Sequence, residues 1–220
     1  MNATNQSDEI KNLWQIIEVN PSSIMEMRAI KGREIICKRF YAINYPSPDA
    51  MQQAFEETAL RYNCNGFNIY IVMNPIKSGC KGNSAADSDI DCRKLLLIDI
   101  DRALPSKAPA SESELEAAES LAKQICDFLE EGGLINPIIV MSGNGYHLYY
   151  KLDAVANNPE NSAIIECFLK KLAAKFDNQD VKIDTCVYNA SRITKVVGTI
   201  ARKGAETSER PYRMARVVTW

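Results

Sequence analysis

The order of the elements expected from residue 95 onward restricts the fold more than any other feature of the sequence. Apolar residues recur there with the periods of a strand, a helix, two strands and a second helix. A capping box of Ser111 and Glu114 begins the first helix, and Gly132 ends it. The elements are expected at 95–101 (LLLIDID), 111–131, 135–142, 145–152 and 161–176. This order predicts an α+β fold of the ferredoxin-like type, which RNA-recognition-like domains share.

The region before residue 95 predicts a separate αβ lobe. A helix with one apolar face is expected at 49–62 and a strand at 67–74, whereas the Gly-, Ser- and Asp-rich stretch at 77–93 predicts a loop. With 220 residues and 46% hydrophobic content, the chain can bury a sizeable core. We therefore expect one domain, 1–220, made of two lobes at 1–94 and 95–220.

The composition argues against membrane and disulfide-rich classes. No apolar run reaches the roughly 20 residues that cross a bilayer, and the N-terminus is polar, so we expect a cytoplasmic protein without membrane contact. The seven cysteines are scattered and never spaced as CxxC, which favours reduced thiols over disulfides or zinc. A zinc site of Cys64, Cys80 and Cys92 is the weaker alternative.

Positive charge is concentrated toward the C-terminal end. The formal net charge is −2, but from Lys182 onward eight basic residues stand against three acidic ones, which gives +5 there and −7 for residues 1–181. Such a segment suits phosphate groups, although a solvated basic face is the commoner meaning of the pattern.

Asp99 and Asp101 stand at the end of the apolar strand LLLIDID. Residues two apart in a strand point to the same face, so the two carboxylates project together. Like charges at such a place need a counter-charge, and a divalent metal with oxygen ligands supplies one. The alternative is that both aspartates only cap the strand end and the following turn.

Two further segments carry residues suited to phosphates or metals. The Gly-rich turn SGNGYH, residues 142–147, ends in the only histidine of the chain, His147, and its glycines let backbone N–H groups approach a phosphate. The segment 181–204 supplies a third acid, Asp184, and several cations. These cations are Arg192, Lys195, Arg202 and Lys203. Three carboxylates, one histidine and these cations suit nucleotidyl transfer, in which metal ions and cations stabilise a triphosphate.

LLLIDID, SGNGYH and the block that runs from KID to NASRITKVVGTIARKG resemble the three motifs of the archaeo-eukaryotic primase superfamily, in the same order. More closely, the chain resembles the primase-polymerase (PrimPol) domains of bacterial, plasmid and phage replication proteins and of some CRISPR-associated proteins. The resemblance spans most of the chain. It implies an RNA-recognition-like catalytic lobe packed on an N-terminal αβ lobe, with two Mg²⁺ or Mn²⁺ ions. The implied activity is template-directed addition of NTPs or dNTPs on single-stranded DNA, often with primer synthesis.

The resemblance also assigns roles to single residues. Asp99, Asp101 and Asp184 match the three acids that hold the catalytic metal ions, and His147 matches the histidine that contacts the incoming triphosphate. The expected nucleotide-binding residues are Ser142, Gly143, Asn144, Gly145, His147, Arg192 and Lys203. Weaker candidates for phosphate or template contacts are Lys195, Arg202 and Asn74. In one departure, the superfamily often has serine two places before the histidine, where this chain has Gly145.

Other protein classes share single features with this sequence. A phosphatase of the haloacid dehalogenase type also has DxD after an apolar strand, but Arg102 and Ala103 stand where its small residues would follow. A glycosyltransferase can use a DxD metal site, yet neither class explains SGNGYH or the Arg-rich block. A rolling-circle nuclease needs paired metal-binding histidines, whereas this chain has only one histidine. The non-enzymatic alternative is a catalytically silent nucleic-acid-binding module, against which the intact acids and His147 argue.

The sequence ends in ARVVTW, which is still strand-like. One expectation is therefore a longer protein that carries a helicase or a CRISPR-associated domain. Replication, repair and CRISPR-associated DNA synthesis all fit the motifs equally well as a biological setting.

Overall fold

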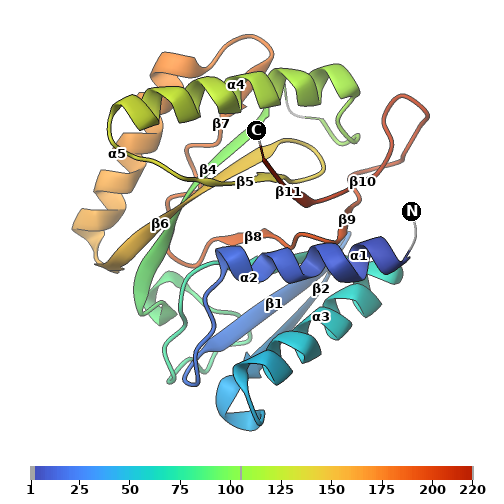
Figure 1. The fold of residues 1–220 in the computed structure, drawn as a ribbon, viewed down its shortest axis with the longest axis vertical. Coiled ribbons are helices and arrows are strands. Elements are labelled where there is room, and N and C mark those ends of the chain that lie inside the picture. Colours follow the sequence, from blue (N-terminus) through green and yellow to red (C-terminus); the bar gives the residue numbers. More distant parts are fainter. Residues whose placement is uncertain (1–2, 105, 220) are drawn as a thin grey trace.

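Two antiparallel sheets form the middle of the molecule, and helices pack on their outer faces (Figure 1). The computed structural model describes residues 3–104 and 106–219. This architecture confirms the predicted α+β class. None of the helices in the described part of the chain is long and apolar enough to cross a membrane. The helices are α1 (Ala3–Glu9), α2 (Leu13–Ile16), α3 (Pro48–Cys64), α4 (Glu112–Glu131) and α5 (Pro159–Phe176), with 3₁₀ turns at Ile10–Asn12, Ala42–Asn44 and Asp87–Asp89.

The larger sheet has five strands in the order β11-β5-β6-β4-β7, and all neighbouring strands are antiparallel. The strands of the structure are β1 (Ile24–Lys31), β2 (Glu34–Tyr41), β3 (Asn68–Val72), β4 (Cys92–Arg102), β5 (Ile138–Met141), β6 (Tyr146–Ala156), β7 (Val181–Ile183), β8 (Ile193–Lys195), β9 (Ile200–Ala201), β10 (Arg213–Met214) and β11 (Arg216–Val218). Along the chain the elements run β4, α4, β5, β6, α5 and β7. In space these four strands lie in the order fourth, first, third, second, which is the ferredoxin-like arrangement that the sequence predicts.

The smaller sheet has the order β2-β1-β3-β8, with α3 on its outer face (Figure 1). The helix expected at 49–62 and the strand expected at 67–74 are confirmed as α3 and β3. Strand β8, however, comes from the C-terminal part of the chain, and its Thr194 pairs with Ile71 of β3. The N-terminal sheet is thus completed by residues far along the sequence, and the division into lobes at residues 94 and 95 stays a prediction.

Strand β4 is buried on both faces, and its side chains alternate between two environments. Ile100 is fully buried, and its cross-strand partner Tyr146 donates a hydrogen bond to Glu119 of α4 (3.1 Å). This face of the strand is therefore covered by α4. Asp99 and Asp101 alternate with Ile100 and must point the other way, toward the four-stranded sheet.

A cluster of charges fixes the start of α4. Ser111 Oγ accepts a hydrogen bond from the Glu114 N–H (3.2 Å), and Glu114 Oε2 accepts one from the Ser111 N–H (2.9 Å), which confirms the capping box. The Glu114 carboxylate also accepts from Arg102 (2.9 Å) and Arg210 (2.8 Å). The hydrogen bond from Arg210 lowers the pKa of Glu114 to about 2, although burial opposes this shift. The cluster joins the end of β4, the helix and the C-terminal segment.

Replacing Glu114 by glutamine should lower the free energy of unfolding at neutral pH by about 1.5–3 kcal/mol, because two arginines lose a charged acceptor. A carboxyl group whose pKa is lowered by folding stabilises the fold above its unfolded pKa of 4.5, and this contribution is lost as the pH falls toward about 2. Denaturant unfolding curves of Glu114→Gln and the wild type should therefore converge across this interval. The control is Glu116→Gln, an exposed position of the same helix. Equal losses in both variants would contradict the assigned role.

Candidate active site

Asp99 and His147 face each other from neighbouring strands. They are direct partners in the register of β4 with β6, and Asp99 Oδ1 lies 3.3 Å from His147 Nε2. Asp101 lies two residues further along β4 on the same face. All three residues line a cleft of about 490 Å³ between the two sheets. The other residues that line it are Ile30, Asn68, Tyr70, Leu97, Ser142, Asn144, Arg192, Ile193, Thr194, Lys195, Ala201, Arg202 and Lys203. The cleft thus unites residues from all three sequence motifs.

The two carboxyl groups of the cleft differ in their affinity for a proton. Burial alone would raise the pKa of Asp99, but His147, Arg192 and Lys203 hold it below its usual value. Burial, and then the charge of Asp99, raise the pKa of Asp101 to about 6. Burial would lower the pKa of His147, yet Asp99 raises it overall. Asp99 and Asp101 are therefore a like-charged, half-buried pair that needs additional positive charge when both are ionised.

Asp184, the third predicted metal ligand, stands next to this pair through the backbone. Its N–H donates to the carbonyl oxygen of Asp99 (2.8 Å), just beyond the pairing of β7 with β4. Its Oδ1 accepts a hydrogen bond from the Cys186 N–H (2.8 Å), so the carboxylate is engaged in a local turn, and Asp184 is not among the residues that line the cleft. The role of Asp184 as a metal ligand stays a prediction.

The donor set of the cleft fits a divalent ion only in part. Within residues 3–104 and 106–219, no group of three or more His, Cys, Asp or Glu side chains is arranged to hold a metal ion, and the seven cysteines are free. Cys64, Cys80 and Cys92 therefore form no zinc site there. Asp99 and Asp101 supply two hard oxygen ligands, and Mg²⁺ is commonly held by one or two carboxylates together with the phosphates of a substrate. The pair suits such a shared site.

The turn SGNGYH is shaped by its own polar groups. Ser142 Oγ donates to the carbonyl oxygen of Gly145 (3.1 Å), and Asn144 Oδ1 accepts from the Ala110 N–H (2.9 Å). A Cβ atom on Gly145 would collide with the Ile100 carbonyl oxygen and lie 2.7 Å from Asp101 Oδ1. The close approach of the turn to β4 thus requires glycine at position 145.

Cations border the carboxylates on the side of the basic segment. Arg192 donates to the carbonyl oxygen of Cys186, and its Nε has no hydrogen-bond partner among the described residues. Arg202 Nη1 is likewise buried without a partner in this part of the structure. Burial, and then the charge of Arg202, lower the pKa of Lys195 to about 7. With Lys203, these groups give the cleft a positive side that suits a polyphosphate.

The cleft contains residues that the sequence analysis did not single out. Asn68 and Tyr70 come from β3, and Thr194 comes from β8. Polar residues at alternate positions of the strand expected at 67–74 indicate one polar face, and this pattern could have identified Asn68 and Tyr70. The position of Thr194 depends on pairing between distant segments, so no local pattern predicts it.

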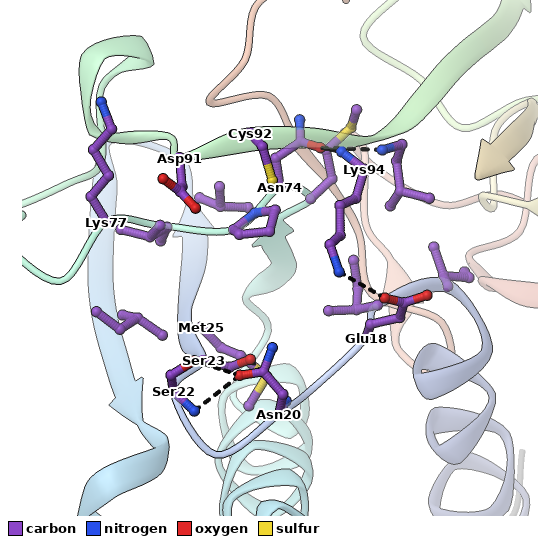
Figure 2. A pocket seen from close by; sticks show the side chains of 18 of the residues that line it. Glu18, Asn20, Ser22, Ser23, Met25, Asn74, Lys77, Asp91, Cys92 and Lys94 are labelled. Carbon is purple, nitrogen blue, oxygen red and sulfur yellow. Dashed lines mark hydrogen bonds and ion pairs between the residues drawn. The ribbon is translucent and has the colours of Figure 1, made fainter. Parts of the chain in front are cut away.

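A second pocket, of about 400 Å³, lies at the start of β4, and Asn74 is one of the residues that line it (Figure 2). Asn74 Oδ1 accepts from the backbone N–H of Lys94 (3.0 Å), and its Nδ2 donates to the Ala190 carbonyl oxygen (3.0 Å). Lys94 also forms an ion pair with Glu18 (2.9 Å) at this pocket. Asp99, the nearer carboxylate, lies five positions beyond Lys94, which is about 17 Å along a strand. Asn74 therefore fixes the start of β4 and does not reach the carboxylates.

Replacing Gly145 by alanine should cost about 1–3 kcal/mol of stability and displace Asp101, because the added Cβ overfills a closed space. Denaturant unfolding measures this cost. Gly79→Ala is the matched control, since a Cβ at Gly79 meets no atom within 4 Å. If Gly145→Ala unfolds at the same denaturant concentration as Gly79→Ala, the close approach is wrong.

No protein-family model matches this sequence, and no curated protein is similar to it. Among solved structures, the chain is similar to the polymerase domain of Ligase D from Mycobacterium tuberculosis, determined in complex with DNA. The two chains are 13% identical, and the match covers 97% of this chain and 81% of that one with a TM-score of 0.54. This chain therefore has the α+β fold of a polymerase domain.

Proposed function

We propose that this chain is a nucleotidyltransferase of the archaeo-eukaryotic primase superfamily that extends or primes DNA on a single-stranded template. One observation carries the proposal: Asp99, Asp101 and His147, from two separate sequence motifs, meet in one cleft that cations border. The fold shared with a DNA-bound polymerase domain supports it independently.

In the proposed reaction, a primer 3′-hydroxyl attacks the α-phosphorus of an NTP or dNTP, and pyrophosphate leaves. Asp99 and Asp101 would hold Mg²⁺ or Mn²⁺, which when bound supplies Lewis-acid stabilisation of the phosphoryl oxygens. His147 Nε2 lies at the cleft and can donate a hydrogen bond to the triphosphate. Arg192 and Lys203 neutralise the negative charge of the triphosphate, which would otherwise repel the attacking hydroxyl oxygen.

The finer assignment to primase-polymerases of replication, repair or CRISPR-associated systems rests on the three motifs and their order. Single-stranded DNA and nucleoside triphosphates are the proposed partners. Primase-polymerase motifs of this kind also suit a chain that works together with a helicase or a CRISPR-associated domain. Cationic side chains that bind the phosphates of the DNA template release counterions. The affinity for the template should therefore fall steeply as the salt concentration rises.

The phosphatase alternative loses support from the topology. Strand β4 is antiparallel to both of its neighbours, β6 and β7. Doubly wound α/β enzymes instead place their sites at the carboxyl ends of parallel strands. The silent binding module is separated from the polymerase by the assay that follows.

The decisive assay compares wild type with Asp99→Ala/Asp101→Ala on single-stranded DNA, with and without an annealed primer, supplied with NTPs or dNTPs and Mg²⁺ or Mn²⁺. We expect metal-dependent products from the wild type and a loss of several orders of magnitude in the variant, since each ~1.4 kcal/mol of lost stabilisation is tenfold in rate. Asp153→Ala, an exposed position of β6, is the control and should stay active. Folded wild-type protein that binds DNA but makes no product would favour the silent module.

His147→Ala should mainly weaken nucleotide binding. A hydrogen bond to a charged group contributes about 1.5–3 kcal/mol, so the KM for the nucleotide should rise by about 10- to 100-fold. Steady-state kinetics with the primed template measure this change. An unchanged KM and kcat would remove His147 from the site.

A further inference from the structure

The second ring nitrogen of His147 has a buried partner. Nδ1 lies 2.9 Å from the hydroxyl oxygen of Tyr149, which in turn contacts Thr194 Oγ1, and Thr194 Oγ1 lies 3.4 Å from the same Nδ1. The residues are 7%, 0% and 2% exposed, respectively. No bulk water competes for these bonds, so an unmatched donor or acceptor here would be costly.

The three residues come from both sheets. His147 and Tyr149 lie two apart on β6 and share the face that points into the cleft. Thr194 lies on β8 of the four-stranded sheet, opposite Ile71. The hydroxyl contact therefore ties the imidazole to the facing sheet as well as to its own strand.

The two sides of the imidazole favour the same tautomer. The Asp99 carboxylate is an acceptor on the Nε2 side, so Nε2 must carry a hydrogen for this 3.3 Å contact to be attractive. A neutral imidazole with hydrogen on Nε2 leaves Nδ1 as an acceptor. The Tyr149 hydroxyl can donate to Nδ1 while its oxygen accepts from the Thr194 hydroxyl. Burial raises the pKa of Tyr149, so the phenol keeps the hydrogen that it donates.

We propose that Tyr149 and Thr194 are positioning residues that hold His147 in the tautomer with hydrogen on Nε2 and direct that N–H into the cleft. The use of this N–H toward a triphosphate rests on the proposed function, whereas the tautomer does not. In the free protein this N–H points at Asp99 Oδ1, so a triphosphate would compete with that carboxylate for it.

His147 is the only histidine of the chain, so a protein labelled with ¹⁵N-histidine gives the ¹⁵N resonances of one imidazole. At a pH where the ring is neutral, their chemical shifts report the tautomer without nucleotide or metal. We expect hydrogen on Nε2 in the wild type. Tyr149→Phe should raise the fraction with hydrogen on Nδ1 about fivefold, the equivalent of one hydrogen bond.

Two further variants make the test specific. Thr194→Val should shift the tautomer in the same direction by a smaller factor, whereas Thr194→Ser, which keeps the hydroxyl, should match the wild type. The matched control is Tyr150→Phe, because the Tyr150 hydroxyl points to the α4 side, beside Cys126. Wild-type protein with hydrogen on Nδ1, or a tautomer ratio that Tyr149→Phe leaves unchanged, would overturn the proposal.

The same variants separate this inference from the proposed function. In an active enzyme, Tyr149→Phe should raise the nucleotide KM about fivefold, whereas Tyr150→Phe should leave it unchanged. If the wild type makes no product but Tyr149→Phe still shifts the tautomer, the polymerase assignment fails and the positioning role stands. If the wild type is active and the tautomer does not change, the positioning role fails alone.

Discussion

The register of β4 against β6 is the constraint on which the rest of the site depends. It places Asp99 opposite His147 and Ile100 opposite Tyr146, so one face of the pair meets α4 and the other meets the cleft. A slip by one residue would bury the carboxylates under the helix and expose the apolar residues to the cleft. Packing of the strand against α4 therefore positions the chemical groups, although none of the packing residues has a chemical role.

The cleft brings two half-buried carboxylates together with cations, and each kind of charge reduces the cost of burying the other. Burial, and then the charge of Asp99, raise the pKa of Asp101 to about 6. Lys195, another residue that lines the cleft, is buried, and burial and the charge of Arg202 lower its pKa to about 7. Buried charges of either sign are costly unless they are paired. A ligand that brings both a metal cation and phosphates would complement the two sides at once, which is the chemistry of a nucleoside triphosphate.

The sequence predicted what local patterns encode. Apolar periodicity located the helices and strands from β3 to α5, and the capping box of Ser111 and Glu114 defined the start of α4. Contacts between distant segments were beyond such patterns: the pairing of β8 with β3, the contact of Thr194 with Tyr149, and the turn that engages Asp184. Gly145 departs from the motif of the superfamily that the sequence resembles. The requirement for glycine there, set by the proximity of Ile100 and Asp101, depends on the packing of the turn against β4.

The origin of β8 has a consequence for how the protein is made. Strands β1 to β3 leave the ribosome early, but their sheet gains its fourth strand only when residues 193–195 have emerged. Until then, β3 presents an unpaired edge, which is a hazard for pairing with other chains. Contacts between residues so far apart in sequence also form slowly. The segment that carries Arg192 and Lys195 therefore completes the N-terminal sheet late. The same segment supplies cations of the proposed site, so the site is completed at the step that covers the edge of β3.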